Sequence, residues 1–455
     1  MRNGPYKSAT RAISNVTRAM SSQAPSKAHL HKPILSSKFP VGYAVGGSHC
    51  GVKKDASVND LGLIVSTTDS PASAAACFTR NAFKAAPVVV SQDILTKSAG
   101  KARAIVVNSG CANAVTGTQG MKDAWAMSKE TDVAMFKSKA TPSTLVMSTG
   151  VIGQTLPISK ILEGIRASAD NLGSDFAAWE QAAKAFMTTD TFPKLVARTF
   201  ALGDTTYRMA GIAKGAGMIH PDMAPALPHA TLLGCVVTDA AVAPKALQKA
   251  LTYAVDRSFN SISVDGDMST NDTIVALANG AAGGPELTAT DPAFATFQEE
   301  LKDFAVQLAQ LVVRDGEGAT KFVTVSVRNA PTYEDAHRIA SKISTSALVK
   351  TALYGEDANW GRVLAATGSV PLSNGASIDT GKVNVSFIPS DGTSKLPVLV
   401  NGEPEKVDED RAKEILSLED FEVEVDLGME GGQEAQYWTC DLSYEYVRIN
   451  GDYRS

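Results

Sequence analysis

Hydrophobic residues recur along the chain in two patterns, one typical of buried strands and one typical of amphipathic helices. Short apolar runs rich in Val and Ile stand between Gly, Asn and Ser residues, and we expect them to form strands. They cover 61–66, 86–91, 104–108, 144–147, 232–237, 322–327, 383–388, 396–400 and 421–427. In the run 421–427 apolar residues alternate with acidic ones, so one face of that strand should meet a core and the other water.

The helical pattern is clearest between 292 and 314, where Phe297, Leu301 and Phe304 are spaced three and four residues apart. That spacing places them on one face of a helix. Further stretches with helical patterns cover 170–186, 244–258 and 333–354. Because strands alternate with long helices along the chain, the sequence predicts a layered α/β protein.

One boundary between loop and strand has chemical interest. Three prolines lie between 214 and 228, and because proline lacks a backbone donor this segment is expected to loop before the apolar run begins. Thr231 stands at that boundary, either as an ordinary β-branched residue that starts a strand or as a new chain end after cleavage of the Ala230–Thr231 bond. In the second interpretation its hydroxyl would be a nucleophile, and its own α-amine, with a pKa of ~8, would be the base.

Composition places the 455-residue chain among ordinary globular proteins, with 44% hydrophobic and 20% charged residues. A formal charge of −5 argues against a nucleic-acid surface, which needs clustered Lys and Arg. No apolar run approaches the ~20 residues of a membrane span, so we expect a soluble protein.

Residues 1–27 differ from the rest of the chain. They carry five basic residues, several serines and no acidic residue, and the first carboxylate is Asp55. Such a composition is typical of a mitochondrial targeting presequence, and a basic disordered tail is the alternative. We therefore expect a protein of the mitochondrial matrix that loses residues 1–27.

Several common chemistries have no support in the sequence. The five cysteines form no CxxC pair, and HExxH, GxSxG, Walker A and GxGxxG motifs are missing. Asp265, Asp267 and Asp272 lack the spacing of a Ca²⁺-binding loop, so capping or solvated carboxylates are expected there. The sequence thus predicts neither a metal nor a redox cofactor.

Polar turns follow two of the predicted strands. Residues 108–120 follow one strand, and Ser148-Thr149-Gly150 follows another. Backbone amides at such strand ends can stabilise an oxyanion, although a plain polar turn is the alternative. Glu317 stands in a loop between a predicted helix and strand, where it is either a functional group or a solvated carboxylate.

Ten short motifs, in one order along residues 33–455, resemble the ornithine acetyltransferase family, the ArgJ-type glutamate N-acetyltransferases of arginine biosynthesis. The motifs are TRNAFKAAPV at 79–88, NSGCANAVTG at 108–117, STGVIG at 148–153, MTTDT at 187–191, KGAGMIHP at 214–221, ATLLG at 230–234, SISVDGDMSTNDT at 261–273, GEGATK at 316–321, NWGRVLAA at 359–366 and INGDYRS at 449–455. One such motif alone is weak evidence for a family, but ten motifs in this order identify the family with high specificity.

The resemblance implies a layered αββα fold of the autocatalytic aminopeptidase type. It also implies self-cleavage at Ala230–Thr231 into an α chain, 28–230, and a β chain, 231–455, which stay together as α₂β₂. Thr231 would be the nucleophile, and Thr149 and Gly150 would form the oxyanion hole. The residues implied to line the substrate site are Thr188, Lys214, Thr231, Glu317, Asn450 and Ser455.

The implied reaction moves an acetyl group from N-acetylornithine to glutamate through an acetyl-threonine intermediate, with no cofactor. Acetyl-CoA as a further acetyl donor is left open. Relatives commonly run Met-Ala-Thr, whereas here PALPHA, 225–230, stands before Thr231, and Ser455 stands where relatives often have Thr. Two other functions stay open: a self-cleaving amidohydrolase or aminopeptidase that passes the acyl group to water, and a processed binding protein without catalysis.

Overall fold

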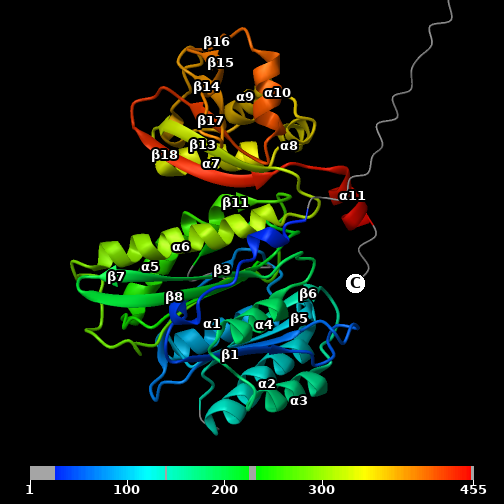
Figure 1. The fold of residues 1–455 in the computed structure, drawn as a ribbon, viewed down its shortest axis with the longest axis vertical. Coiled ribbons are helices and arrows are strands. Elements are labelled where there is room, and N and C mark those ends of the chain that lie inside the picture. Colours follow the sequence, from blue (N-terminus) through cyan, green and yellow to red (C-terminus); the bar gives the residue numbers. More distant parts are fainter. Residues whose placement is uncertain (1–25, 139–140, 225–231, 452–455) are drawn as a thin grey trace, which may run out of the picture.

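The computed structural model describes residues 26–138, 141–224 and 232–451 of the chain. Three β-sheets and the helices between and around them are stacked in layers (Figure 1). The layered α/β class predicted from the sequence is confirmed. Residues 1–25 of the predicted presequence lie outside the described residues.

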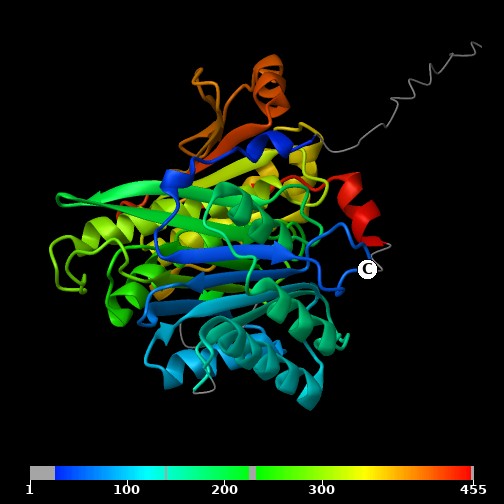
Figure 2. The same cartoon turned by 60° about the horizontal axis from the view of Figure 1, so that its bottom comes forward.

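The first sheet has four strands in the order β1-β2-β5-β6. Its strands are β1 (Tyr43–Ser48), β2 (Leu61–Ser66), β5 (Ala104–Cys111) and β6 (Thr144–Val151). Strands β5 and β6 run parallel, and the other pairs are antiparallel. Helices α2 (Gly117–Phe136) and α3 (Ile158–Ser168) cover its outer face (Figure 2).

The second sheet runs β4-β3-β12-β10-β8-β7, and β9 pairs with β3 beside that path. Its strands are β3 (Ala72–Thr79), β4 (Lys101–Ala102), β7 (Lys194–Leu202), β8 (Thr205–Lys214), β9 (Met223–Ala224), β10 (Leu233–Thr238) and β12 (Thr273–Ala278). Cys235 packs in the core towards the first sheet, whereas Val236 packs in the core towards α5 and α6. Because both faces of the central strands β10 and β12 are buried, these two strands consist almost entirely of apolar residues.

The third sheet runs β11-β18-β13-β17-β14-β15-β16. Its strands are β11 (Ile262–Ser263), β13 (Phe322–Ala330), β14 (Asn384–Pro389), β15 (Leu396–Val400), β16 (Glu403–Pro404), β17 (Asp420–Asp426) and β18 (Gln433–Cys440). The apolar side of β17 is buried, as its alternating pattern predicts. It packs in a hydrophobic core that belongs to the third sheet and is separate from the cores of the other two sheets.

The remaining helices separate and cover these sheets. They are α1 (Ala86–Lys97), α4 (Phe176–Phe186), α5 (Pro244–Asp256), α6 (Phe294–Arg314), α7 (Tyr333–Ser344), α8 (Ala347–Tyr354), α9 (Trp360–Gly368), α10 (Glu409–Ser417) and α11 (Tyr444–Gly451). Helices α1 and α4 contact both the first and the second sheet, and α6 contacts both the second and the third. Within the described ranges, no helix is long and apolar enough to span a membrane.

Three of the predicted elements need correction. Residues 86–91 are the start of helix α1 instead of a strand, because Pro87 fits the first helical turn and the helix continues to Lys97. The helix predicted over 170–186 begins at Phe176, where the Asp175 side chain accepts a hydrogen bond from the backbone N–H of Ala178. The helix predicted over 333–354 is two helices, because Ser346 caps a new one.

Candidate active site

A buried lysine and a threonine from different sheets meet at the centre of the candidate site. Lys214 ends β8, and its Nζ donates a hydrogen bond of 3.2 Å to Oγ1 of Thr149 on β6. Both side chains are buried, with 4% and 1% of their surface exposed. Burial lowers the pKa of Lys214, since an ammonium loses hydration inside the protein. The structure thus brings together two residues that the family resemblance assigns to the site.

Gly150, directly after Thr149, lies against the backbone of the neighbouring strand. It is the register partner of Gly110 and has a φ of +126°. A Cβ added to Gly150 would lie 2.3 Å from the carbonyl carbon of Gly110, which no side chain can tolerate. Residue 150, next to Thr149 at the end of β6, must therefore be a glycine, without a side chain.

A buried ion cluster connects two loops of the site. Asp190 accepts hydrogen bonds from Lys194 Nζ (2.6 Å), the backbone N–H of Gly215 (2.8 Å) and that of Thr188 (2.9 Å). Burial raises the pKa of Asp190, but the cations Lys194 and Lys214 outweigh it and hold that pKa well below its usual value. The carboxylate thus fixes Thr188 and the turn after Lys214 relative to each other.

Asp315 completes this cluster from the end of α6. Its Oδ2 lies 2.6 Å from Lys194 Nζ, and it also accepts a hydrogen bond of 2.9 Å from the backbone N–H of Thr191. Asp190, Lys194 and Asp315 are not among the predicted site residues. The first two stand four residues apart around the MTTDT motif, but only the fold brings Asp315 to them.

Glu317, which acts electrostatically on Lys214, is bonded to Asn450. Asn450 of α11 donates a hydrogen bond of 2.7 Å from Nδ2 to Oε2 of the buried Glu317. A Cβ on Gly217 would lie 2.4 Å from the same Glu317 oxygen, so a glycine at 217 leaves room for the carboxylate. Helix α11 is the red helix at the right side of Figure 2.

A cavity of about 260 Å³ opens next to Glu317. Most of the residues that line it have polar or charged side chains. The lining consists of Ser26, Lys27, Thr189, Thr191, Arg314, Asp315, Gly316, Glu317, Gly318, Ala319, Glu445, Arg448 and Ile449. Both signs of charge are present in this lining, as a small zwitterionic molecule requires.

The predicted cleavage point lies outside the described residues, as do Ala230, Thr231 and Ser455. The described chain resumes at Leu232, and the next residue, Leu233, is the register partner of Lys214. Leu232 also accepts a hydrogen bond of 2.6 Å at its carbonyl oxygen from the backbone N–H of Thr273. The strand that follows the predicted nucleophile is therefore anchored between β8 and β12, next to Lys214.

The carboxylate of Asp265 binds the backbone of the loop that follows Lys214. Its oxygens accept hydrogen bonds from the backbone N–H groups of Met218 (2.6 Å) and Ile219 (2.9 Å). Among the residues that the structure describes, no group of three or more His, Cys, Asp or Glu side chains could hold a metal ion. The five cysteines are free thiols.

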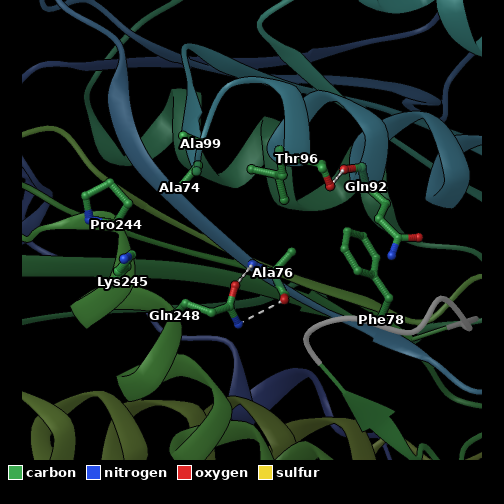
Figure 3. Close-up of a pocket in the computed structure, with 11 residues that line it drawn as sticks. Ala74, Ala76, Phe78, Gln92, Thr96, Ala99, Pro244, Lys245 and Gln248 are labelled. Carbon is green, nitrogen blue, oxygen red and sulfur yellow. Dashed lines mark hydrogen bonds between the residues drawn. The ribbon is translucent and has the colours of Figure 1, made fainter.

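A second cavity, of about 500 Å³, lies between α1, α5 and the edge of β3 (Figure 3). Only one of its eleven lining residues, Lys245, is ionisable. The ionisable groups gather instead near Lys214 and Glu317. The buried Lys214 ammonium meets the Thr149 hydroxyl at the end of β6, and the carboxylate of Glu317 lines the smaller, charged cavity. Those are the features of an enzyme site for a small polar substrate.

Comparison with known proteins agrees with this description. A model of the ArgJ family matches residues 44–455. The "Arginine biosynthesis bifunctional protein ArgJ, mitochondrial" of Coprinopsis cinerea is 68% identical, over 96% of this chain and 96% of that protein. The protein of the same name from Laccaria bicolor is 69% identical, over 95% and 96% respectively. A crystal structure of the arginine biosynthesis bifunctional protein argJ from Bacillus halodurans is 37% identical, covers 47% of this chain and 96% of that chain, and has a TM-score of 0.43.

The chain belongs to the ArgJ family. The predicted family, the mitochondrial location and the assignment as an acyltransferase of arginine biosynthesis are therefore confirmed. The individual site residues and the cleavage point stay predictions.

Proposed function

We propose that this chain moves the acetyl group of N-acetylornithine to glutamate after it has cleaved itself between Ala230 and Thr231. The observation that supports this most is the hydrogen bond between Lys214 and Thr149, beside the strand that begins just after Thr231. A buried cation next to a hydroxyl can stabilise the oxyanion of an acyl-transfer reaction, and this supports the proposal.

In the first half-reaction, Thr231 Oγ attacks the acetamide carbon while the α-amine of Thr231 takes the hydroxyl proton. The carbonyl oxygen becomes an oxyanion, which accepts hydrogen bonds at Thr149 and Gly150. Donors of this kind each lower a barrier by ~3 kcal/mol. When the C–N bond breaks, the proton passes to the leaving nitrogen, and ornithine departs from an acetyl-Thr231 ester.

In the second half-reaction, the amine of glutamate attacks the ester carbon. The Thr231 oxygen leaves and recovers a proton from that amine, so the enzyme returns to its starting state. The acyl bond energy passes from amide to ester to amide, and the cycle needs no metal or redox cofactor. Acetyl-CoA would enter the same cycle as an alternative donor, through attack of Thr231 on its thioester.

The charged side chains have distinct roles in this proposal. Lys214 is bonded to Thr149 and buried, so its positive charge favours the oxyanion. Glu317 lines the polar cavity and would bind the side-chain ammonium of ornithine, while Asn450 holds that carboxylate in place. Thr188 and Ser455 would complete the substrate site. Two α chains and two β chains would form the α₂β₂ assembly.

Intact-mass analysis and an acetyl-transfer assay test the proposal together. Wild type should give two fragments, the second beginning at Thr231, and should release ornithine from N-acetylornithine only as fast as acetylglutamate forms. Thr231→Ala should stay one chain and be inactive, whereas Thr231→Ser keeps a hydroxyl and should retain cleavage. Ornithine release without glutamate would instead identify a hydrolase, and an uncut but active wild type would rule out the α-amine as base.

A further inference from the structure

Lys53 reaches the candidate site from a loop that the sequence analysis did not select. The loop is held by Asp60, whose buried carboxylate accepts hydrogen bonds from the backbone N–H groups of Cys50, Gly51, Val52 and Lys53 at 2.6–3.1 Å. Four donors on one carboxylate leave this turn little freedom. Asp60 thus fixes the position of the Lys53 backbone.

The side chain of Lys53 passes beside the predicted oxyanion hole. A Cβ on Gly110 would lie 3.2 Å from Lys53 Cγ, and Gly110 is the register partner of Gly150. At its end, Lys53 Nζ donates to the backbone oxygens of Met187 (2.7 Å) and Asn59 (2.8 Å). Met187 directly precedes Thr188, so the ammonium lies between the oxyanion hole and the predicted substrate-binding loop.

Two carbonyl oxygens occupy two of the three N–H donors of this ammonium. Within the described ranges, no carboxylate forms an ion pair with it, although Asp60, Asp190 and Lys214 act on it electrostatically. Lys53 is half-buried, and burial lowers its pKa to about 8. A ligand that supplies a negative charge would therefore satisfy both the third donor and the missing counter-charge.

We propose that Lys53 is a further substrate-binding residue, and that its ammonium binds the α-carboxylate shared by N-acetylornithine and glutamate. The assignment follows from position. The α-carboxylate is the substrate carboxylate nearest to the reacting nitrogen, and Lys53 lies beside Gly110, the register partner of Gly150. The side-chain ammonium of N-acetylornithine would then face Glu317, and the side-chain carboxylate of glutamate would face the basic residues Arg314 and Arg448 of the same cavity. This inference rests on the proposed acetyl transfer.

Steady-state kinetics of Lys53→Met test the inference. The KM values for N-acetylornithine and for glutamate should both rise, each about ten-fold, because a charged hydrogen bond is lost, while kcat changes little. Lys53→Gln keeps polar contacts but loses the charge, and its two KM values should rise as much as those of Lys53→Met. Lys54→Met removes the exposed neighbouring lysine and should leave both constants unchanged.

The pH profile separates substrate binding from a purely structural role. In wild type, the KM for N-acetylornithine should rise as the pH passes about 8, because Lys53 loses its charge there; in Lys53→Met that rise should be missing. Self-cleavage, checked by mass, shows that each variant has folded. Unchanged KM values, a change for only one substrate, or a pH-dependent rise that persists in Lys53→Met would overturn the inference. A wild type without acetyl transfer would instead refute the proposed function, so the two failures are distinguishable.

Discussion

At the scale of single residues, the clearest constraint in the site is the approach of Gly150 to Gly110. Both glycines have positive φ angles, +126° and +117°, which L side chains rarely adopt. At Gly150 a side chain would have two costs: the unfavourable φ and a clash of its Cβ with the backbone of Gly110. The glycine is therefore required both by its conformation and by the space around it.

We expect Gly150→Ala to destabilise the protein by about 2 kcal/mol or more and to abolish acetyl transfer, because β5 and β6 must move apart. Gly153→Ala is the matched control: it also has a positive φ, +80°, but nothing lies within 4 Å of the added Cβ. Gly153→Ala should lower the free energy of unfolding by only about 1 kcal/mol. Chemical unfolding measures both variants, and equal losses would show that the close contact with Gly110 has no cost.

At the scale of elements, the run 86–91 shows where local pattern fails. Three consecutive valines favour a strand by propensity, and a short apolar run cannot by itself be told from a buried helix segment. The fold resolves this through Val90 and Ile94, which are one helical turn apart and both buried. By contrast, the helix from Phe294 to Arg314 and the strand from Leu61 to Ser66 carry long or well-bounded patterns, and both form as predicted.

One strand edge is completed by a side chain. Strand β3 pairs with β4 at Ala72 and Ser73 and with β9 at Phe78 and Thr79, and between them Gln248 of α5 bonds to both backbone groups of Ala76 (Figure 3). The side-chain amide thus takes the place of a neighbouring strand at this point.

Gln248→Ala should lower the free energy of unfolding by about 1–3 kcal/mol, because the backbone N–H and C=O of Ala76 lose their partners. Lys245→Ala on the same helix removes an exposed side chain and should stay within about 0.5 kcal/mol of wild type. Urea unfolding compares the two variants. If both have the stability of wild type, water replaces the Gln248 amide without cost.

At the scale of the whole molecule, the predicted cut would fall inside a sheet. The second sheet takes β3, β4, β7, β8 and β9 from residues before Thr231, and β10 and β12 from residues after it. Strand β10 pairs with β8 over six register positions, from Leu233 opposite Lys214 to Thr238 opposite Met209. Each predicted chain would therefore need the other to complete its core.

We expect the two fragments to co-elute from a size-exclusion column under native conditions and to separate only in strong denaturant. The physical reason is that separation would expose the apolar strands β8 and β10 and break their backbone hydrogen bonds. Mass analysis of the eluted peak identifies the fragments. Fragments that separate without denaturant would contradict the α and β chains as parts of one fold.

The sequence by itself determined the α/β class, most strand and helix positions, the family and the presequence-like N-terminus, because these depend on local periodicity, composition and ordered motifs. It also selected Thr149, Lys214, Glu317 and Asn450, which the fold brings to one place. Only the tertiary structure revealed the Asp190–Lys194–Asp315 cluster and the position of Lys53. Asp190 and Lys194 are only four residues apart, but Asp315 and Lys194, and Met187 and Lys53, are more than a hundred positions apart. The chemistry of these contacts comes from burial and distance, which no local pattern contains.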